Sequence, residues 1–123
     1  MGGSVFIGEA AIKSGASQRA IRLYESLGLL QVLREGKYRI YSDSDIEFIK
    51  LIKEAQSLGL QLSEMKQLKA EKYDFDWQRV SELLNKKQAE ADADIKKLTL
   101  HKLRLKQYQQ SIDTCLQMLD SAP

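Results

Sequence analysis

The stretch GASQRAIRLYESLG at residues 15–28 decides the fold. Ser17 is a good helix N-cap because its hydroxyl can accept a hydrogen bond from a free backbone amide of the first turn, and Gly28 suits the position after a helix end. Between them the apolar residues Ile21, Tyr24 and Leu27 recur at helical spacing, whereas Gln18, Arg19, Arg22 and Glu25 point elsewhere. The pattern predicts a short helix with an apolar inner face and a cationic outer face.

Another short helix is predicted just upstream. EAAIK at residues 9–13 follows the apolar residues 5–7 and is closed by Gly15. Two short helices joined at a glycine and a serine are typical of a helix-turn-helix. The second helix of such a unit is the one that can present its side chains to a DNA major groove.

A hairpin is predicted next. Residues 29–33 and 38–41 are two β-prone runs, and the polar residues 34–37 between them include a glycine. A hairpin in this position forms a wing. We therefore expect a mostly α-helical fold whose head, over residues 5–70, is a winged helix-turn-helix.

Two more helices complete the predicted head. Ser42 and Asp45 resemble a capping box, and Ile46, Ile49 and Ile52, with Phe48 as a further candidate, make the apolar face of a helix that ends near Gly59. The next helix begins at about residue 63, with Met65 and Leu68 facing inward. Residues 71–76 break the periodicity, so we interpret them as a hinge.

A long helix is predicted over residues 77–119, because no glycine or proline interrupts them. At roughly 1.5 Å per residue it exceeds about 60 Å. Apolar residues recur every seven positions, which is typical of a coiled-coil seam: Leu84, Ala91, Leu98, Leu105, Ile112 and Leu119, with His101, Tyr108 and Cys115 in a second row that Lys87 and Asp94 interrupt. We expect an identical chain to cover the stripe in a two-fold dimer. The predicted interface residues are Leu84, Leu98, Leu105, Tyr108, Ile112 and Leu119.

The composition limits the class of protein. At 123 residues, with 43% hydrophobic and 29% charged residues, the chain has room for one small domain and a long extension. It contains no apolar run long enough to cross a bilayer and no basic-then-apolar leader, so we expect a cytoplasmic protein without a membrane partner. The single cysteine excludes an internal disulfide and fits a reducing compartment.

The residue pattern argues against an enzyme. There is one histidine, and we find no nucleophile–base pair, carboxylate dyad, phosphate-binding glycine loop or closed metal-ligand spacing. We therefore predict no catalytic residues, no cofactor and no metal site.

The distribution of charge favours DNA as a partner more than the net charge of +2 does. Residues 1–41 carry six basic and three acidic side chains, whereas the remainder is nearly balanced. Arginine reads guanine edges and binds phosphates, although the helical cations could also be a solvated face. The predicted DNA-binding residues are Gln18, Arg19, Arg22 and Tyr24 on the helix and Arg34, Lys37, Tyr38 and Arg39 on the hairpin. Tyr41 could instead pack in the core.

An ordered set of short motifs resembles the MerR family of transcriptional activators and repressors. The set covers the first 70 residues: Ile7 to Ala11, Gly15 to Ser17, Ala20 to Glu25, Gly28 to Leu30, Tyr38 to Tyr41, and Ile46 through Leu68. The long terminal helix is similar to that family's dimer helix in length and character.

The resemblance implies an antiparallel coiled-coil homodimer that binds a promoter operator and, in response to an effector, untwists and bends an over-long spacer for RNA polymerase. It assigns Arg22 and Tyr24 to the recognition-helix motif and Tyr38 and Arg39 to the wing motif. The position of Arg19 is often a DNA contact as well.

The sequence departs from the family pattern at three places. Leu23 stands where an aromatic residue is usual, the wing is short and lacks prolines, and the paired cysteines of the metal sensors are missing. Cys115 is therefore either a sensing thiol or a small apolar seam residue, and we favour the second interpretation. We likewise interpret His101 as a core or rim residue of the seam whose ring nitrogens bond to a carboxylate.

Other interpretations stay open from sequence. Tyr73, Phe75 and Trp77 could line a small-molecule pocket or could join the head to the helix. The whole chain could be an excisionase-like or architectural protein that bends DNA without an effector. It could also be a coiled-coil module whose basic head binds protein.

Overall fold

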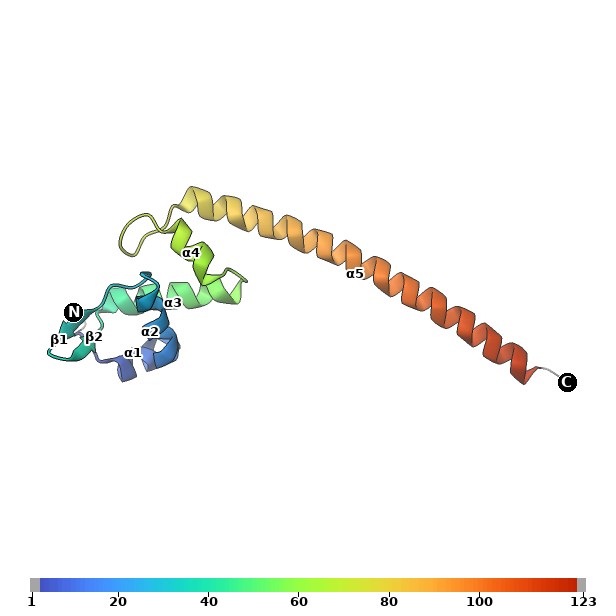
Figure 1. Ribbon diagram of the computed structural model, residues 1–123, viewed down its shortest axis with the longest axis horizontal. Coiled ribbons are helices and arrows are strands. Elements are labelled where there is room, and N and C mark those ends of the chain that lie inside the picture. Colours follow the sequence, from blue (N-terminus) through green and yellow to red (C-terminus); the bar gives the residue numbers. More distant parts are fainter. Residues whose placement is uncertain (1–2, 122–123) are drawn as a thin grey trace. The chain divides into compact units, whose positions relative to one another are not determined.

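The computed structural model describes residues 3–121. Its elements are α1 (Ile7–Ser14), α2 (Gln18–Ser26), β1 (Leu33–Glu35), β2 (Tyr38–Ile40), α3 (Asp43–Ser57), α4 (Leu62–Leu68) and α5 (Trp77–Asp120), labelled in Figure 1. They form two compact units, a head that ends at Val80 and a tail that begins at Ser81. The fold is mostly helical with one antiparallel hairpin, as predicted.

The helix ends follow the predicted capping residues. The Ser17 hydroxyl accepts a hydrogen bond from the Ala20 amide at 3.0 Å at the start of α2. At the start of α3, the Ser42 hydroxyl accepts from the Asp45 amide at 3.1 Å, and the Asp45 carboxylate accepts from the Ser42 amide at 2.7 Å. Gly15 ends α1 with a φ of 78°, a left-handed conformation that costs a residue without Cβ little.

The core of the head lies where α1, α2 and α3 pack together (Figure 1). Its fully buried large side chains are Tyr24, Tyr41, Ile21, Leu29, Leu30, Ile49, Ile52 and Met65. Ile46, Phe48 and Leu68 are also buried, as their helical spacing predicts. Burial of such apolar surface provides the main driving force for folding the head.

The first predicted hairpin run is wrong in its boundaries. Leu29 and Leu30 are core residues just after α2, and β1 begins only at Leu33. The antiparallel register pairs Leu33 with Ile40, Arg34 with Arg39, and Glu35 with Tyr38. The hairpin is therefore shorter than the β-prone pattern indicates, because the two leucines gain more from burial in the core than from sheet pairing.

The segment predicted as a hinge is a packed part of the head. Phe75 is buried, and its backbone forms an isolated β-bridge with Lys69. The Phe48 ring stacks on both Tyr73 and Phe75, with centroid distances of 4.8 and 5.5 Å. Residues 71–76 therefore pack on α3 through Tyr73 and Phe75, and their role as a hinge stays a prediction.

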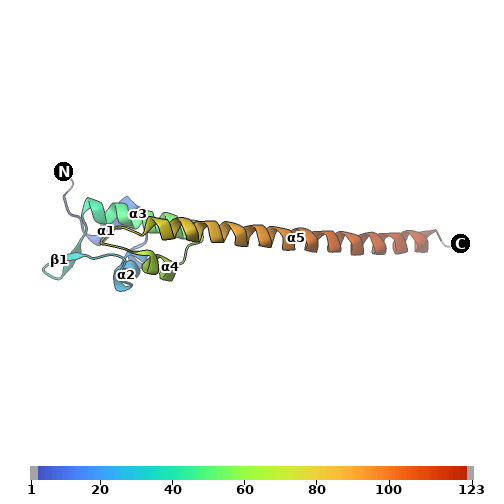
Figure 2. The same cartoon turned by 90° about the horizontal axis from the view of Figure 1, so that it is seen from above.

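The tail is a single stretch of α5, which Figure 2 shows as one continuous helix. The whole of α5, including its first turn in the head, has 44 residues and is about 66 Å long at 1.5 Å per residue. None of the residues described in α5 is buried within one chain. The tail therefore has no core of its own.

No helix in residues 3–121 has both the length and the apolar character that crossing a bilayer requires.

Candidate nucleic-acid interface

The outer face of α2 carries the predicted DNA-reading residues. Gln18, Arg19 and Arg22 are all exposed, and Gln18 and Arg22 lie one helical turn apart. On the opposite face Ile21 and Tyr24 are buried to 0% and 2% exposure. The buried face fixes the helix on the head, so that its guanidinium and amide groups project from a rigid support.

Tyr24, which the sequence places among the DNA-binding residues, is buried in the head. Its ring is in the core and its hydroxyl donates a 2.6 Å hydrogen bond to Oε1 of Gln56 on α3. Burial raises the pKa of Tyr24. The side chain thus joins α2 to α3, because helical spacing turns it inward together with Ile21.

The hairpin presents cations and a phenol beside α2. Arg34, Lys37 and Tyr38 are exposed, as predicted for phosphate contacts. Lys37 Nζ lies 5.5 Å from the centroid of the Tyr38 ring. The same ring contacts Phe6, with a centroid distance of 5.7 Å. Tyr38 stays 58% exposed beside these two contacts.

Arg39 makes the closest ion pair of the hairpin cations within the head. Its Nε donates a 2.6 Å hydrogen bond to Oε2 of Glu25, the last carboxylate of α2. Oε1 of the same carboxylate lies 4.0 Å from Arg34 Nη2. Glu25 therefore faces two hairpin arginines, a role that its spacing in α2 did not reveal.

Tyr41 lies in the core, which is one of the two positions that the sequence left open for it. It is 0% exposed, and its backbone exchanges two hydrogen bonds with Val5, at 2.8 and 2.9 Å. Among residues 3–121 its hydroxyl has no hydrogen-bond partner. Burial raises the pKa of Tyr41, and the nearby Glu25 carboxylate raises it further.

Three hydrogen bonds between residues far apart in sequence hold the segment that follows α2 and the start of α3. Lys69 Nζ donates to the Gly28 carbonyl at 2.7 Å. The Tyr73 hydroxyl is hydrogen-bonded to the Gln31 carbonyl at 2.9 Å and to the Asp45 carboxylate. The segment that joins α2 to β1 is thus held by residues about 40 positions later. No local pattern signals such contacts.

Tyr73 itself has a φ of 59°, in the left-handed region that a tyrosine seldom adopts. Such a conformation persists where surrounding contacts enforce it. Here those contacts are the stack on Phe48 and the hydroxyl bonds to the head. Phe75 and Trp77 continue the cluster, with centroids 5.9 Å apart, around an apolar hollow of about 50 Å³ that Met65 and Leu68 also line. The aromatic cluster therefore packs within the head.

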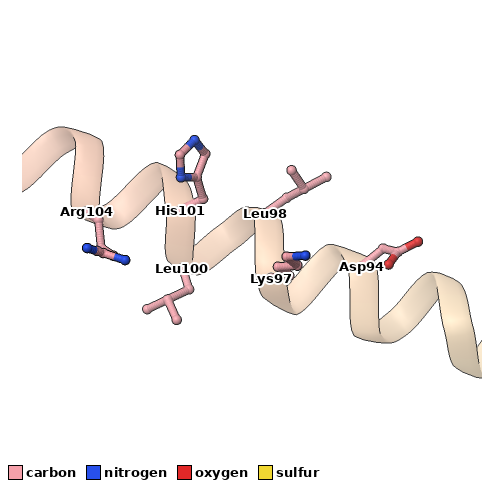
Figure 3. Close-up of a pocket in the computed structure, with 6 residues that line it drawn as sticks. All are labelled: Asp94, Lys97, Leu98, Leu100, His101 and Arg104. Carbon is pink, nitrogen blue, oxygen red and sulfur yellow. The ribbon is translucent and has the colours of Figure 1, made fainter.

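In the tail, the predicted seam residues lie at the surface of the single chain. Figure 3 shows six residues of α5 between Asp94 and Arg104, with Leu98 and His101 on one side of the helix and Leu100 and Arg104 on the other. Leu84 is half-buried, whereas Leu98, Leu105, Tyr108, Ile112 and Leu119 are more than half exposed in the single chain. Cys115 and His101 are exposed as well. The predicted seam thus runs along an uncovered face, and its pairing stays a prediction.

Metal-binding side chains do not converge in the part of the chain that the structure describes. It contains no group of three or more histidine, cysteine, aspartate or glutamate side chains placed to hold an ion.

Comparison with protein families gives two matches. Residues 6–72 match the model described as MerR HTH family regulatory protein. Residues 46–108 match the one described as MerR, DNA binding.

Curated relatives are bacterial regulators. The HTH-type transcriptional regulator HmrR of Rhizobium leguminosarum bv. viciae is 34% identical over 96 residues, which cover 76% of this chain and 74% of that protein. The heavy metal-dependent transcription regulator 2 of Rhizobium meliloti is 41% identical over 66 residues, or 52% of this chain and 45% of that protein. In the latter match the chain spans about half the length of its relative.

Two solved structures share the fold. The regulator PbrR691 from Ralstonia metallidurans, in complex with lead(II), has a TM-score of 0.66 at 22% identity and covers 82% of both chains. HiNmlR, a regulator lacking the sensor domain and bound to promoter DNA, has a TM-score of 0.55 at 23% identity over 97% of both chains.

Proposed function

We propose that this chain, which belongs to the MerR family of helix-turn-helix regulatory proteins, regulates transcription by binding a promoter operator through α2 and the hairpin. The observation that carries the proposal is the outer face of the head. Gln18, Arg19 and Arg22 project from a rigidly buried helix, and Arg34 and Lys37 lie on the adjoining hairpin.

The two parts of this face suit different contacts. An α-helix fits the major groove, where arginine can bond the O6 and N7 of guanine and glutamine the N6 and N7 of adenine. We assign these base contacts to Arg22, Arg19 and Gln18. The hairpin cations and the Tyr38 hydroxyl suit backbone phosphates, which fix the register of the protein without reading sequence. The relatives are regulators, and we assign no catalytic step to the chain.

We infer that the operator is bound by a homodimer paired through the tail. The uncovered apolar face of α5 and its sevenfold repeat support this pairing. An antiparallel pair related by a two-fold axis presents two copies of α2 to two inverted half-sites. We expect the dimer to untwist an over-long promoter spacer in response to an effector, together with RNA polymerase in the cytoplasm.

A thiolate-held metal does not fit as the effector. Several relatives respond to heavy metals by name, whereas this sequence contains one cysteine, Cys115. Two chains could combine two thiols only if both lay near the crossing point of the pair. Cys115 lies five residues before the end of α5 at Asp120, so in an antiparallel pair the two copies are far apart. Zinc and copper sites rich in sulfur need more thiolates than this arrangement supplies.

Selection from a pool of random DNA duplexes tests the proposed function. The purified chain is expected to enrich an inverted repeat, and its affinity for the enriched duplex should fall steeply with salt because phosphate contacts release counterions. Enrichment of nothing, or an affinity insensitive to salt, would favour the protein-binding alternative.

A further inference from the structure

We propose that Glu25 is a positioning residue that fastens the hairpin to α2, so that recognition helix and wing meet DNA as one unit. The inference rests on the proposed DNA-binding face. It concerns a carboxylate that itself carries the wrong charge for a DNA contact.

The geometry places Glu25 between the two parts. It lies near the end of α2, and its side chain is 22% exposed. One carboxylate oxygen accepts the 2.6 Å hydrogen bond from Arg39 Nε, and the other lies 4.0 Å from Arg34 Nη2. Arg39 is on β2 and Arg34 on β1, so a single carboxylate contacts both strands of the hairpin.

The hairpin needs such a contact. Its strands are three residues each, and a two-stranded hairpin of that size is marginal on its own. Arg34 and Arg39 are direct cross-strand partners, and like charges in that relation destabilise a sheet. Glu25 offsets their repulsion and at the same time ties the pair to α2.

A backbone anchor just after β2 acts together with the ion pair. Tyr41, two residues after Arg39, holds the end of β2 to Val5 by two backbone hydrogen bonds. Side chains two residues apart share one face of a strand. The backbone bonds fix where β2 ends, and the Glu25–Arg39 pair fixes how its middle lies against α2.

The positioning role predicts a change in DNA affinity opposite to the one expected from charge alone when Glu25 is removed. A carboxylate beside a DNA-binding face repels phosphates, so its removal should strengthen binding to any duplex. If Glu25 positions the hairpin, its removal should instead weaken binding to the operator, because Arg34, Lys37 and Tyr38 no longer meet the phosphates in register.

The test compares Glu25→Gln with Glu35→Gln on two short duplexes, one enriched by the wild-type protein and one of scrambled sequence. Glu35 is an exposed carboxylate on the same hairpin, so its variant makes the same charge change. We expect Glu25→Gln to lose about fivefold in affinity for the enriched duplex, a loss of the size that one ion pair contributes, and none for the scrambled one. Glu35→Gln should gain slightly on both. Equal or tighter binding of the enriched duplex by Glu25→Gln overturns the proposal.

A double variant separates positioning from a direct contact. If the ion pair is what matters, Glu25→Gln combined with Arg39→Gln should lose less affinity for the enriched duplex than the product of the two single losses, because most of the effect of Glu25 passes through Arg39. Losses that multiply independently would overturn the proposed pairing of the two side chains.

A measurement without DNA keeps the proposal testable if no duplex is enriched, which would instead count against the proposed function. Hydrogen exchange at the backbone amides of residues 33–40 should be faster in Glu25→Gln than in wild type and unchanged in Glu35→Gln. Circular dichroism confirms that each variant is folded. Unchanged exchange in Glu25→Gln overturns the positioning role.

Discussion

The head and the tail use apolar residues in opposite ways. In the head, Ile21, Leu29 and Ile49 are fully buried within one chain, and even the segment before α5 is packed by Phe48 and Phe75. Along the tail, leucines at sevenfold spacing remain exposed. The difference teaches that the head has a core of its own, whereas the apolar residues of the tail are not covered within one chain.

The largest effect is expected from a charge in the tail's seam. Leu105→Glu should dissociate the proposed dimer, because burying an unpaired carboxylate costs several kcal/mol and each dimer carries two copies. Leu100→Glu is the matched control, since Leu100 has nearly the same exposure, 59% against 58%, and lies off the stripe. Sedimentation at micromolar concentration reads the outcome. A Leu105→Glu variant that stays dimeric would mean that the helices pair by another face.

A cavity in the core of the head should lower the stability of the head, in contrast to a change in the tail. Ile49 is fully buried on α3, and Ile49→Ala should destabilise the head by about 2 to 5 kcal/mol. Ile112→Ala in the tail should weaken self-association and leave the melting of the head unchanged. Thermal melts at several protein concentrations distinguish the two. Equal loss of head stability in both variants would show that the two units fold as one.

Arg22→Ala should separate DNA reading from both folding and pairing. Loss of a recognition-helix guanidinium removes about 1 to 3 kcal/mol of specific contact, roughly fivefold to more than a hundredfold in Kd. The circular dichroism spectrum and sedimentation should match wild type. Lys97→Ala, which removes an exposed cation from the tail, serves as the control. Undiminished operator binding by Arg22→Ala at physiological salt would refute the recognition-helix assignment.

Tyr41→Phe tests the cost of a buried hydroxyl that has no hydrogen-bond partner among the described residues. The Tyr41 hydroxyl is buried and unpartnered among residues 3–121, so its removal should be neutral or should stabilise the head by up to about 1 kcal/mol. Its raised pKa adds a pH dependence. The unfolded chain releases this proton near the ordinary pKa of about 10, before the folded chain does, so stability falls as pH rises above that value. Denaturant titrations at neutral and alkaline pH should show a smaller alkaline loss in Tyr41→Phe; an equal loss would exclude Tyr41 as its source.

The smallest effect is expected at Cys115. Cys115→Ser should retain effector-dependent activation in a reporter assay, and purified wild-type protein should carry no stoichiometric zinc or copper. Both expectations follow from one thiol per chain placed near a helix end. Loss of induction with unchanged DNA affinity would make Cys115 the sensor and would give the tail a chemical role besides pairing.

Local patterns predicted the parts of the head that local forces decide. Ser17, the Ser42–Asp45 box and Gly15 each act within a few residues, and the structure confirms all of them. The spacing of Ile46, Ile49 and Ile52 predicted their burial because a helix with one apolar face has one way to pack.

Sequence reasoning was wrong or silent where distant residues decide the structure. Leu29 and Leu30 look like strand residues but fill a core that α3 completes. Residues 71–76 break the helical periodicity, and only the structure shows that Phe48 of α3 stacks on Tyr73 within them. The charge pattern placed Arg39 with the DNA contacts, and only the folded head reveals that it is also hydrogen-bonded to Glu25 of α2. Tyr24 shows the converse, since a motif position does not imply an exposed side chain.

If the uncovered stripe of α5 pairs two chains, the amount of active protein depends on how many chains the cell makes. Under the proposed pairing, at chain concentrations well below the dimer dissociation constant, the amount of dimer rises as the square of the number of chains. A promoter that responds only to the dimer would then be nearly silent at low expression and would fill over a narrow range of synthesis. The exposed leucines at residues 98 and 105 would thus set a threshold copy number at which the cell begins to respond.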